Sequence, residues 1–262
     1  MLEKSGSTHN KAIVNYNGEY ITYEQLHAEA LEMEEYQKHR MLTCVVCDKT
    51  YETVKLVYKL FYLKQPMLFV SHDATDTYIE DIVQRFQVNY LWKNQSLKLI
   101  KEKTGDGEKR IHKDLAVMLS TSGSVGKPKF VKLSYENFKI ASEIGKNEMG
   151  VKEGQTGMLV VPLEHILGLI FCIYHWAVNG TIVVSPYNVM DSRFEELYDR
   201  ERVNNIAGVP LTYAMLKKTE FWDAKDRVER LNLAMAAGAK MDKALQEYLV
   251  LVDLQLTLFC II

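Results

Sequence analysis

Short apolar runs alternate with amphipathic segments along this chain, and this alternation constrains the fold more than any other feature. The first half contains four runs that are typical of buried strands, at 42–47, 67–71, 88–92 and 115–119. Segments with helical spacing lie between them, the clearest at 51–63 and 75–86. Strands that read as continuous apolar runs, separated by helices, indicate a parallel sheet covered on both faces. We therefore predict an α/β, doubly wound fold with largely parallel sheets and helices on both faces.

The same pattern extends to the start and to the second half of the chain. Asn17-Gly18 separates two short strand-like segments and predicts a tight hairpin, because both residues tolerate positive φ. Further strands are predicted at 158–161 and 181–185, with an apolar helical stripe over 166–177 between them. The order of strands and helices therefore continues past the middle of the chain.

Helix starts and a domain boundary are also predicted. Ser134 is a candidate N-cap, and Ser192 with Glu195 three residues later has the spacing of a capping box. No internal repeat and no low-complexity tract divides the sequence. We expect two α/β subdomains, residues 1–114 and 115–262, the second carrying the Ser/Gly-rich segment described below.

Composition argues against several classes of protein. The 262 residues carry a net charge of −2, so the excess of positive charge typical of a nucleic-acid binder is missing. The longest apolar stretch, 166–178, is interrupted by His175 and is too short to span a bilayer. The first residues, Met1 to Gly6, do not resemble a signal peptide. We predict a cytoplasmic protein with no membrane span and no nucleic-acid partner.

Two of the four cysteines, Cys44 and Cys47, have the spacing of a zinc or thiol-exchange pair. A structural zinc site needs a second pair of ligands, and a redox pair normally lies on a loop that opens a helix. Here the pair lies within an apolar run. We interpret both cysteines as buried strand residues and predict no metal ligands among them.

A segment rich in serine and glycine follows the strand at 115–119 and gives the strongest functional signal. It reads Ser-Thr-Ser-Gly-Ser-Val-Gly-Lys-Pro-Lys over 120–129. Hydroxyls and glycines at the carboxyl end of a strand offer donors to a polyanion without side-chain bulk, and this is the edge where open α/β sheets bind ligands. A surface loop without a ligand is the alternative. The P-loop of ordinary ATPases is excluded, because Thr121 replaces its first glycine and Pro128 its final hydroxyl residue. A dinucleotide fingerprint is also absent.

Residues 121–129 resemble the phosphate-loop signature of the AMP-dependent synthetase and ligase superfamily, the adenylate-forming enzymes, with Val125 replacing a threonine. Other segments resemble landmarks of this family in the same order: 21–26, 133–137, 162–168, 208–213 and 237–241. The resemblance covers nearly the whole chain. It implies the amino-terminal part of the adenylate-forming fold, similar to acyl-CoA synthetases.

The resemblance implies a role for each matching residue. The ATP phosphates are bound by Thr121, Ser122, Gly123, Ser124 and Gly126, and the catalytic residue is Lys129, which neutralises charge on the departing pyrophosphate. Adenine contacts are implied for Gly238 and Ala239, and the acid pocket for His165 and Gly168. A structural role is the alternative for His165.

The reaction that the resemblance implies is the ATP-dependent adenylation of a carboxylic acid with Mg²⁺, followed by thioester formation with CoA or a carrier thiol. Amino-acid-activating relatives have an aspartate in place of His165, so an acid without an α-amino group fits better. A phosphotransferase is not supported, because no acidic metal-binding cluster stands at motif spacing.

The family's later AMP-contacting and magnesium-contacting loop, and its carboxyl-terminal lid domain, have no matching residues in this chain. The expectation is a truncated enzyme that works with a carboxyl-terminal half in trans or with a carrier protein. The alternative is a catalytically inactive remnant that binds nucleotide weakly or binds a protein partner.

Overall fold

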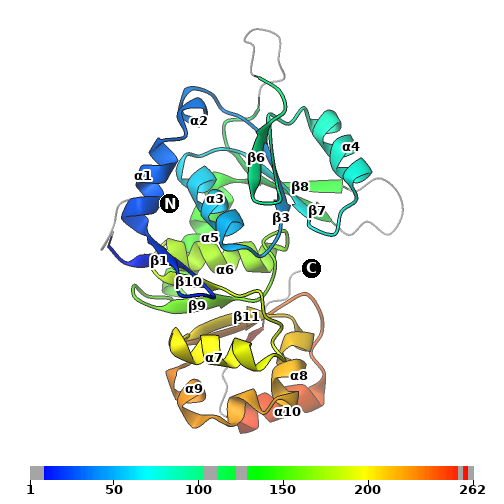
Figure 1. Ribbon diagram of the computed structural model, residues 1–262. Coiled ribbons are helices and arrows are strands. Elements are labelled where there is room, and N and C mark those ends of the chain that lie inside the picture. Colours follow the sequence, from blue (N-terminus) through cyan, green and yellow to red (C-terminus); the bar gives the residue numbers. More distant parts are fainter. Residues whose placement is uncertain (1–8, 103–110, 122–128, 253–255, 259–262) are drawn as a thin grey trace.

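The computed structural model describes residues 9–102, 111–121, 129–252 and 256–258, which form two sheets with helices between and around them (Figure 1). The six-stranded sheet has the order β6-β5-β3-β4-β7-β8 and the seven-stranded sheet the order β13-β12-β11-β9-β10-β1-β2. All neighbouring strands pair in parallel except β2, β6 and β8, which pair antiparallel at the sheet edges. The predicted doubly wound α/β fold is confirmed.

The strands of the six-stranded sheet are β3 (Thr43–Cys47), β4 (Met67–Ser71), β5 (Tyr90–Lys93), β6 (Ser96–Leu99), β7 (Leu115–Thr121) and β8 (Lys129–Ser134). Those of the seven-stranded sheet are β1 (Lys11–Asn15), β2 (Tyr20–Thr22), β9 (Thr156–Leu159), β10 (Thr181–Val184), β11 (Asn205–Gly208), β12 (Leu233–Ala236) and β13 (Leu256–Leu258).

Helices lie in three layers around the two sheets (Figure 1). The central layer contains α1 (Tyr23–Leu31), α3 (Tyr51–Tyr62), α5 (Tyr135–Asn147) and α6 (Ile166–Trp176). The outer face of the six-stranded sheet is covered by α4 (Asp76–Phe86), with α2 (Glu34–Lys38) following α1 in the chain. The outer face of the seven-stranded sheet packs against α7 (Ser192–Arg200), α8 (Pro210–Lys218), η1 (Phe221–Asp223), α9 (Lys225–Arg230) and α10 (Lys243–Leu251).

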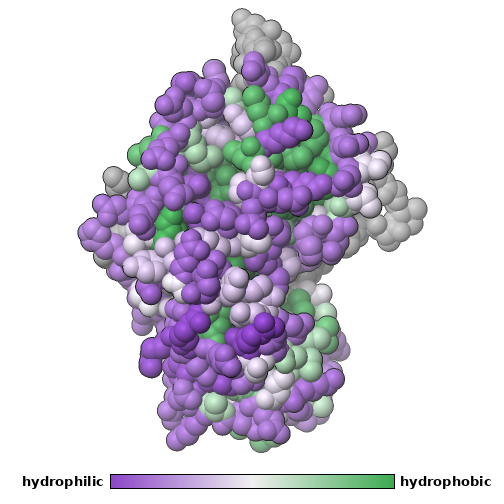
Figure 2. Space-filling model, in the orientation of Figure 1, coloured by the Kyte–Doolittle hydropathy of each residue, from purple (hydrophilic) through white to green (hydrophobic). Residues whose placement is uncertain are grey.

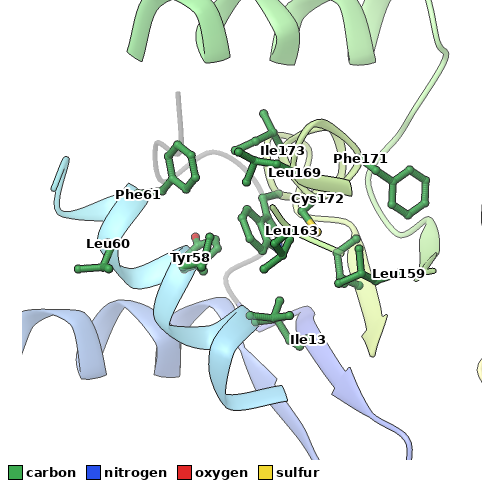
Figure 3. Close-up of a cluster of buried hydrophobic side chains, with 14 of the residues drawn as sticks. Ile13, Tyr58, Leu60, Phe61, Leu159, Leu163, Leu169, Phe171, Cys172 and Ile173 are labelled. Atoms are coloured by element: carbon green, nitrogen blue, oxygen red, sulfur yellow. The ribbon is translucent and has the colours of Figure 1, made fainter. Parts of the chain in front are cut away.

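The central helices share one hydrophobic cluster with both sheets. Tyr58 and Phe61 of α3 lie in it together with Leu169 and Ile173 of α6, and strand residues such as Ile13 complete it (Figure 3). All five are at most 2% exposed. Because one cluster joins both sheets, the two sheets cannot separate without exposing most of the core.

Alternate residues of strand β3 pack into two different hydrophobic clusters, one on each face of the sheet. Val45 and Cys47 face the central cluster, whereas Cys44 and Val46 face the cluster under α4. This alternation follows from the two-residue period of a strand. It sends the two cysteines to opposite faces, so they cannot share a zinc ion or form a disulfide with each other. Burial raises the pKa of both thiols, and the interpretation as buried strand residues is confirmed.

Several predicted elements agree closely with the structure. The hairpin β1–β2 turns at Gly18, whose φ of +87° lies in the region that glycine favours. The predicted strand at 67–71 coincides with β4. Ser134 caps α5 by accepting a hydrogen bond from the amide of Asn137. Local sequence signals are sufficient for these elements.

Other predictions require correction. The N-cap of α7 is Asp191, whose side chain accepts from the amide of Arg193, so the capping box at Ser192 is wrong. The strands β6 and β8 were not predicted. The division into subdomains 1–114 and 115–262 stays a prediction. The sheets themselves draw strands from both sides of it, because β7 and β8 join the sheet of β3 to β6, while β1 and β2 join the other sheet.

A buried polar network closes the amino ends of β9, β11 and β12. The ring of His175 contacts the Phe171 carbonyl through Nδ1 at 2.8 Å and the Asn205 side-chain nitrogen through Nε2 at 2.9 Å. Since the amide nitrogen of Asn205 donates, Nε2 accepts and Nδ1 carries the proton. Asn205 also donates to Gln155 and accepts from Asn232. The network therefore needs a neutral imidazole.

This network predicts a loss of stability in acid. Burial lowers the pKa of His175 from its ordinary 6.5 to about 4. The unfolded chain therefore takes up the proton first, so the free energy of unfolding is unaffected above pH 6.5 and falls by up to about 3 kcal/mol as the pH drops toward 4. Urea unfolding of the wild type and of His175→Gln, at pH 7 and pH 4.5, measures this contribution.

The variant His175→Gln should lose less stability between the two pH values than the wild type does. His9→Gln is the matched control, because the His9 side chain is 82% exposed. Equal losses in the wild type and in His175→Gln would contradict the assignment.

Candidate functional site

The predicted phosphate loop is held at both ends by a strand hairpin. Thr121 ends β7 and lies opposite Lys129, the first residue of β8. The other predicted phosphate-binding residues, Ser122, Gly123, Ser124 and Gly126, lie outside the described residues. Because β7 also pairs in parallel with β4, its carboxyl end is fixed within the sheet. The loop therefore starts and ends at paired backbone positions, with an exposed Lys129 at its base.

The predicted adenine contacts lie on a turn at the carboxyl end of β12. The amide of Ala237 donates to the carbonyl of Gly208, 3.3 Å away, which keeps this turn beside the end of β11. Gly238 has a φ of +88°, in the region that favours glycine, and Val209 lies next to it. Gly238 and Ala239 are both exposed. The turn thus presents exposed backbone and little side-chain bulk, which suits the approach of a flat ring.

The predicted acid-pocket residues lie where β9 leads into α6. His165 is exposed and is the N-cap residue of α6, although its side chain makes no capping hydrogen bond. Gly168 lies buried in the first turn of the helix. A Cβ atom there would stand 2.4 Å from the carbonyl oxygen of Val161 and 2.5 Å from that of Pro162. Gly168 therefore allows the loop to lie directly against the helix, and it presents no side chain of its own.

These three regions share one edge of the protein. The phosphate hairpin follows β7 of one sheet, and the acid loop and adenine turn follow β9 and β12 of the other. Figure 1 draws the hairpin end of β7 and β8 on the same side as the turn before α10. The space-filling outline narrows between the upper and lower parts of the molecule (Figure 2). Ligands of open α/β sheets bind at this carboxyl edge.

Glu164, beside His165, is a half-buried carboxyl at the same edge. Burial raises the pKa of Glu164, and a hydrogen bond from the Ser71 hydroxyl is among the interactions that oppose this rise. Ser71 ends β4, so Glu164 connects the acid loop to the other sheet. Its Oε2 atom is buried and has no hydrogen-bond partner among the described residues. The loop thus carries an acceptor that the described residues leave unsatisfied.

Lys49 is a second half-buried charge at this edge, and it is not among the residues predicted from the sequence. It lies just past β3, and its Nζ donates to the carbonyl of Val160 at 3.5 Å. Burial lowers the pKa of Lys49, and the negative charge of Glu164 opposes this. In the sequence, the one feature that could have marked Lys49 as a site residue is its position shortly after a buried strand.

The described part of the chain offers no cluster for a bound metal. No group of three or more His, Cys, Asp or Glu side chains comes together there. We therefore assign no step of a reaction to Mg²⁺ in this part of the protein. None of the described helices combines the length and apolar character needed to cross a bilayer.

Comparisons with known proteins agree on one family. The model of the AMP-binding enzyme family matches residues 42–253. An acyl-CoA ligase, sidI, of Beauveria bassiana is 29% identical over 152 residues, which are 57% of this chain and 26% of that protein. The luciferin 4-monooxygenase of Luciola mingrelica is 26% identical over 205 residues, 75% of this chain and 34% of that protein.

Two solved structures share the fold. The o-succinylbenzoate CoA synthetase of Bacillus subtilis in complex with AMP superposes with a TM-score of 0.78 at 18% identity, over 97% of this chain and 56% of that one. MatB from Rhodopseudomonas palustris gives a TM-score of 0.78 at 15% identity, over 97% and 57%. This chain thus spans about half the length of these structures and 26–34% of the length of the two curated relatives.

The close contact at Gly168 predicts a loss of stability on substitution. Gly168→Ala should lower the free energy of unfolding by about 1–3 kcal/mol, because the added methyl group meets two backbone carbonyls that can move only with the loop. Urea unfolding measures the loss. Wild-type stability of Gly168→Ala would contradict the packing argument.

Proposed function

The chain belongs to the AMP-binding enzyme family, and from this premise we propose that it forms the nucleotide-binding and acid-binding part of an enzyme that adenylates a carboxylic acid with ATP. One observation carries the proposal. The family match spans the β7–β8 hairpin, whose loop has the Ser/Gly-rich sequence and opens at the carboxyl edge of the sheet. This is the position from which backbone donors can reach a polyanion.

The proposed chemistry is the transfer of an adenylyl group. An oxygen of the substrate carboxylate attacks the α-phosphorus of ATP, a new P–O bond forms, and the bond to the β-phosphate oxygen breaks. The products are an acyl-adenylate and pyrophosphate. Thr121 and the loop after it hold the phosphates, and Lys129 stabilises the charge that develops on the leaving pyrophosphate. Gly238 and Ala239 provide the surface for adenine.

The proposed acid site is the loop between β9 and α6. His165 is exposed at the start of α6, and Glu164 beside it is half-buried. Neither Glu164 nor His165 matches the aspartate that pairs with a substrate α-ammonium in amino-acid-activating relatives. We propose that the acid lacks an α-amino group. Gly168 contributes by holding the loop against the helix.

The second step is proposed to transfer the acyl group to a thiol. The acyl-CoA ligase and the CoA synthetases among the similar proteins support CoA as the acceptor, and a carrier thiol is the other candidate. The thiolate sulfur attacks the acyl carbon, and AMP leaves. Because the matched relatives are longer than this chain, we propose that residues elsewhere, on the same polypeptide or in trans, complete the reaction.

A second candidate function is weak nucleotide binding without catalysis. Val125 favours it, because the family usually has a threonine at this position of the loop, and valine supplies no hydroxyl to a phosphate. Under this alternative the protein acts through a partner.

Pyrophosphate release tests the proposal. We expect release from ATP, Mg²⁺ and a panel of fatty and aromatic acids when the chain is combined with the carboxyl-terminal part of an adenylate-forming relative. Lys129→Gln should reduce the rate by roughly 100-fold, since it removes one charge from the leaving group's site. Lys132→Gln is the matched control, because Lys132 is also exposed on β8 but lies three residues away and points to the opposite face.

Two outcomes would contradict the proposal. A folded wild-type chain that binds ATP but releases no pyrophosphate with any acid would decide against catalysis and favour the nucleotide-binding alternative. An equal rate for Lys129→Gln and Lys132→Gln would decide against the proposed role of Lys129.

A further inference from the structure

The acid loop, residues 160–165, connects β9 of the seven-stranded sheet to α6. On the side of the helix, the carbonyls of Val161 and Pro162 lie directly against Gly168. The amide of His165 donates to the Pro162 carbonyl at 3.1 Å and closes a turn just before α6. The backbone on this side of the loop is therefore fixed where His165 precedes the helix.

A polar side chain of the six-stranded sheet contacts the same loop through Glu164. The hydroxyl of Ser71, the last residue of β4, donates to the Glu164 carboxyl. The oxygen of this hydroxyl accepts from the amide of Asp73 at 3.4 Å. Because Asp73 uses a lone pair of the oxygen, the Ser71 proton is left for Glu164. Ser71 thus links the end of β4 to the acid loop.

Lys49 makes a second contact from the six-stranded sheet. It lies two residues past β3, and its Nζ donates to the Val160 carbonyl at 3.5 Å. The charges of Lys49 and Glu164 also attract each other, and water screens them little because both are half-buried. Since β3 and β4 are neighbours in the sheet, two adjacent strand ends reach the two ends of one short loop.

The carboxyl of Glu164 is costly where it lies. Its Oε2 atom is buried and has no hydrogen-bond partner among the described residues. Burial raises the pKa of Glu164, and its own amide, His165, the Ser71 hydroxyl and His72 oppose this rise. A charge removed from water destabilises a protein unless other groups compensate it. The compensation from the other sheet comes from Ser71 and Lys49.

From these contacts, we propose that Glu164 and Ser71 are positioning residues for the acid site. Their hydrogen bond fixes the end of the acid loop to β4, and the Lys49 contact fixes its start to β3. His165 follows Glu164 directly, so its position is set by the six-stranded sheet as well as by α6. The effect on the acid rests on the proposed adenylation, whereas the attachment of the loop does not.

Hydrogen exchange of the amides in segment 161–169, measured on the whole chain by mass spectrometry, tests the attachment. Ser71→Ala and Glu164→Ala should each speed exchange of this segment about tenfold, because a hydrogen bond to a charged group is lost. Glu164→Gln keeps an acceptor for the Ser71 hydroxyl and should exchange nearly as the wild type does. Glu143→Ala removes an exposed carboxyl of α5 and is the matched control.

A double variant shows whether Ser71 and Glu164 act through one shared hydrogen bond. If they do, Ser71→Ala combined with Glu164→Ala should exchange no faster than Glu164→Ala alone. Additive effects of the two substitutions would contradict the shared hydrogen bond. Lys49→Gln should speed exchange less than Glu164→Ala does, because a 3.5 Å contact is weak.

Pyrophosphate release, with the carboxyl-terminal part of a relative added, tests the role in the acid site. Ser71→Ala and Glu164→Ala should raise the KM for the acid about fivefold, because the loop is no longer held ready for it, and should leave the KM for ATP unchanged. Glu164→Gln should keep the wild-type KM for the acid. A purely structural defect would instead change both KM values or lower the stability to urea.

The outcomes separate this inference from the proposed adenylation. Unchanged exchange in both Ser71→Ala and Glu164→Ala would overturn the attachment, and faster exchange with an unchanged KM for the acid would overturn the positioning role. A wild type that releases no pyrophosphate would contradict the adenylation, and the exchange rates would still decide whether Ser71 holds the loop. Because Ser71→Ala removes a single oxygen, its result stands even if Glu164→Ala does not fold.

Discussion

The two sheets are held together by the helices that both of them bury. Side chains of α3 and α6 lie in a single hydrophobic cluster (Figure 3). The same cluster contains strand residues of the six-stranded sheet, such as Val45 and Phe69, and of the seven-stranded sheet, such as Ile13. Since apolar burial is the main favourable term in folding, this shared layer fixes how the sheets face each other. The phosphate hairpin, acid loop and adenine turn each follow the carboxyl end of a strand in these sheets, so that packing also sets where they lie. Each of the three lies in a different part of the sequence.

Much of the fold could be predicted from the sequence because the decisive signals are local. β3 and β4 are buried on both faces and therefore read as continuous apolar runs. β6 and β8 have no such run, because they are edge strands with mostly exposed residues such as Lys132 and Val131. Their pairing is imposed by their neighbours. The parallel pairing of β1 with β10, about 170 residues later, has no local signal either, and it places strands from both sides of residue 114 in one sheet.

The residues of the candidate site also fall into those that have a local sequence signal and those that do not. Residues that belong to continuous motifs, such as Thr121 with Lys129 and Gly238 with Ala239, could be proposed from the sequence, because each motif forms one turn or hairpin. The resemblance assigns Gly168 to the acid pocket, and the structure adds a packing reason for the glycine, because the carbonyls of Val161 and Pro162 leave no room for a Cβ atom. Lys49 could not be proposed, because its half-burial results from the approach of β9, which lies more than 100 residues away in the chain.

The polar groups at the two edges of the strands differ in a way that bears on function. At the amino ends, His175, Asn205 and Gln155 satisfy one another in a closed network. At the carboxyl ends, among the residues that the structure describes, one oxygen of Glu164 has no hydrogen-bond partner, and Lys49 makes a 3.5 Å contact to the Val160 carbonyl and interacts electrostatically with Glu164. Neutral unpaired groups such as the Trp222 indole also occur elsewhere, but a half-buried charge costs more than these do. The described polar groups at the amino ends are hydrogen-bonded to one another, whereas the half-buried charges at the carboxyl ends keep an unfavourable desolvation energy. Ligands of such sheets bind at the carboxyl ends, and this arrangement is expected when a ligand supplies the missing partners.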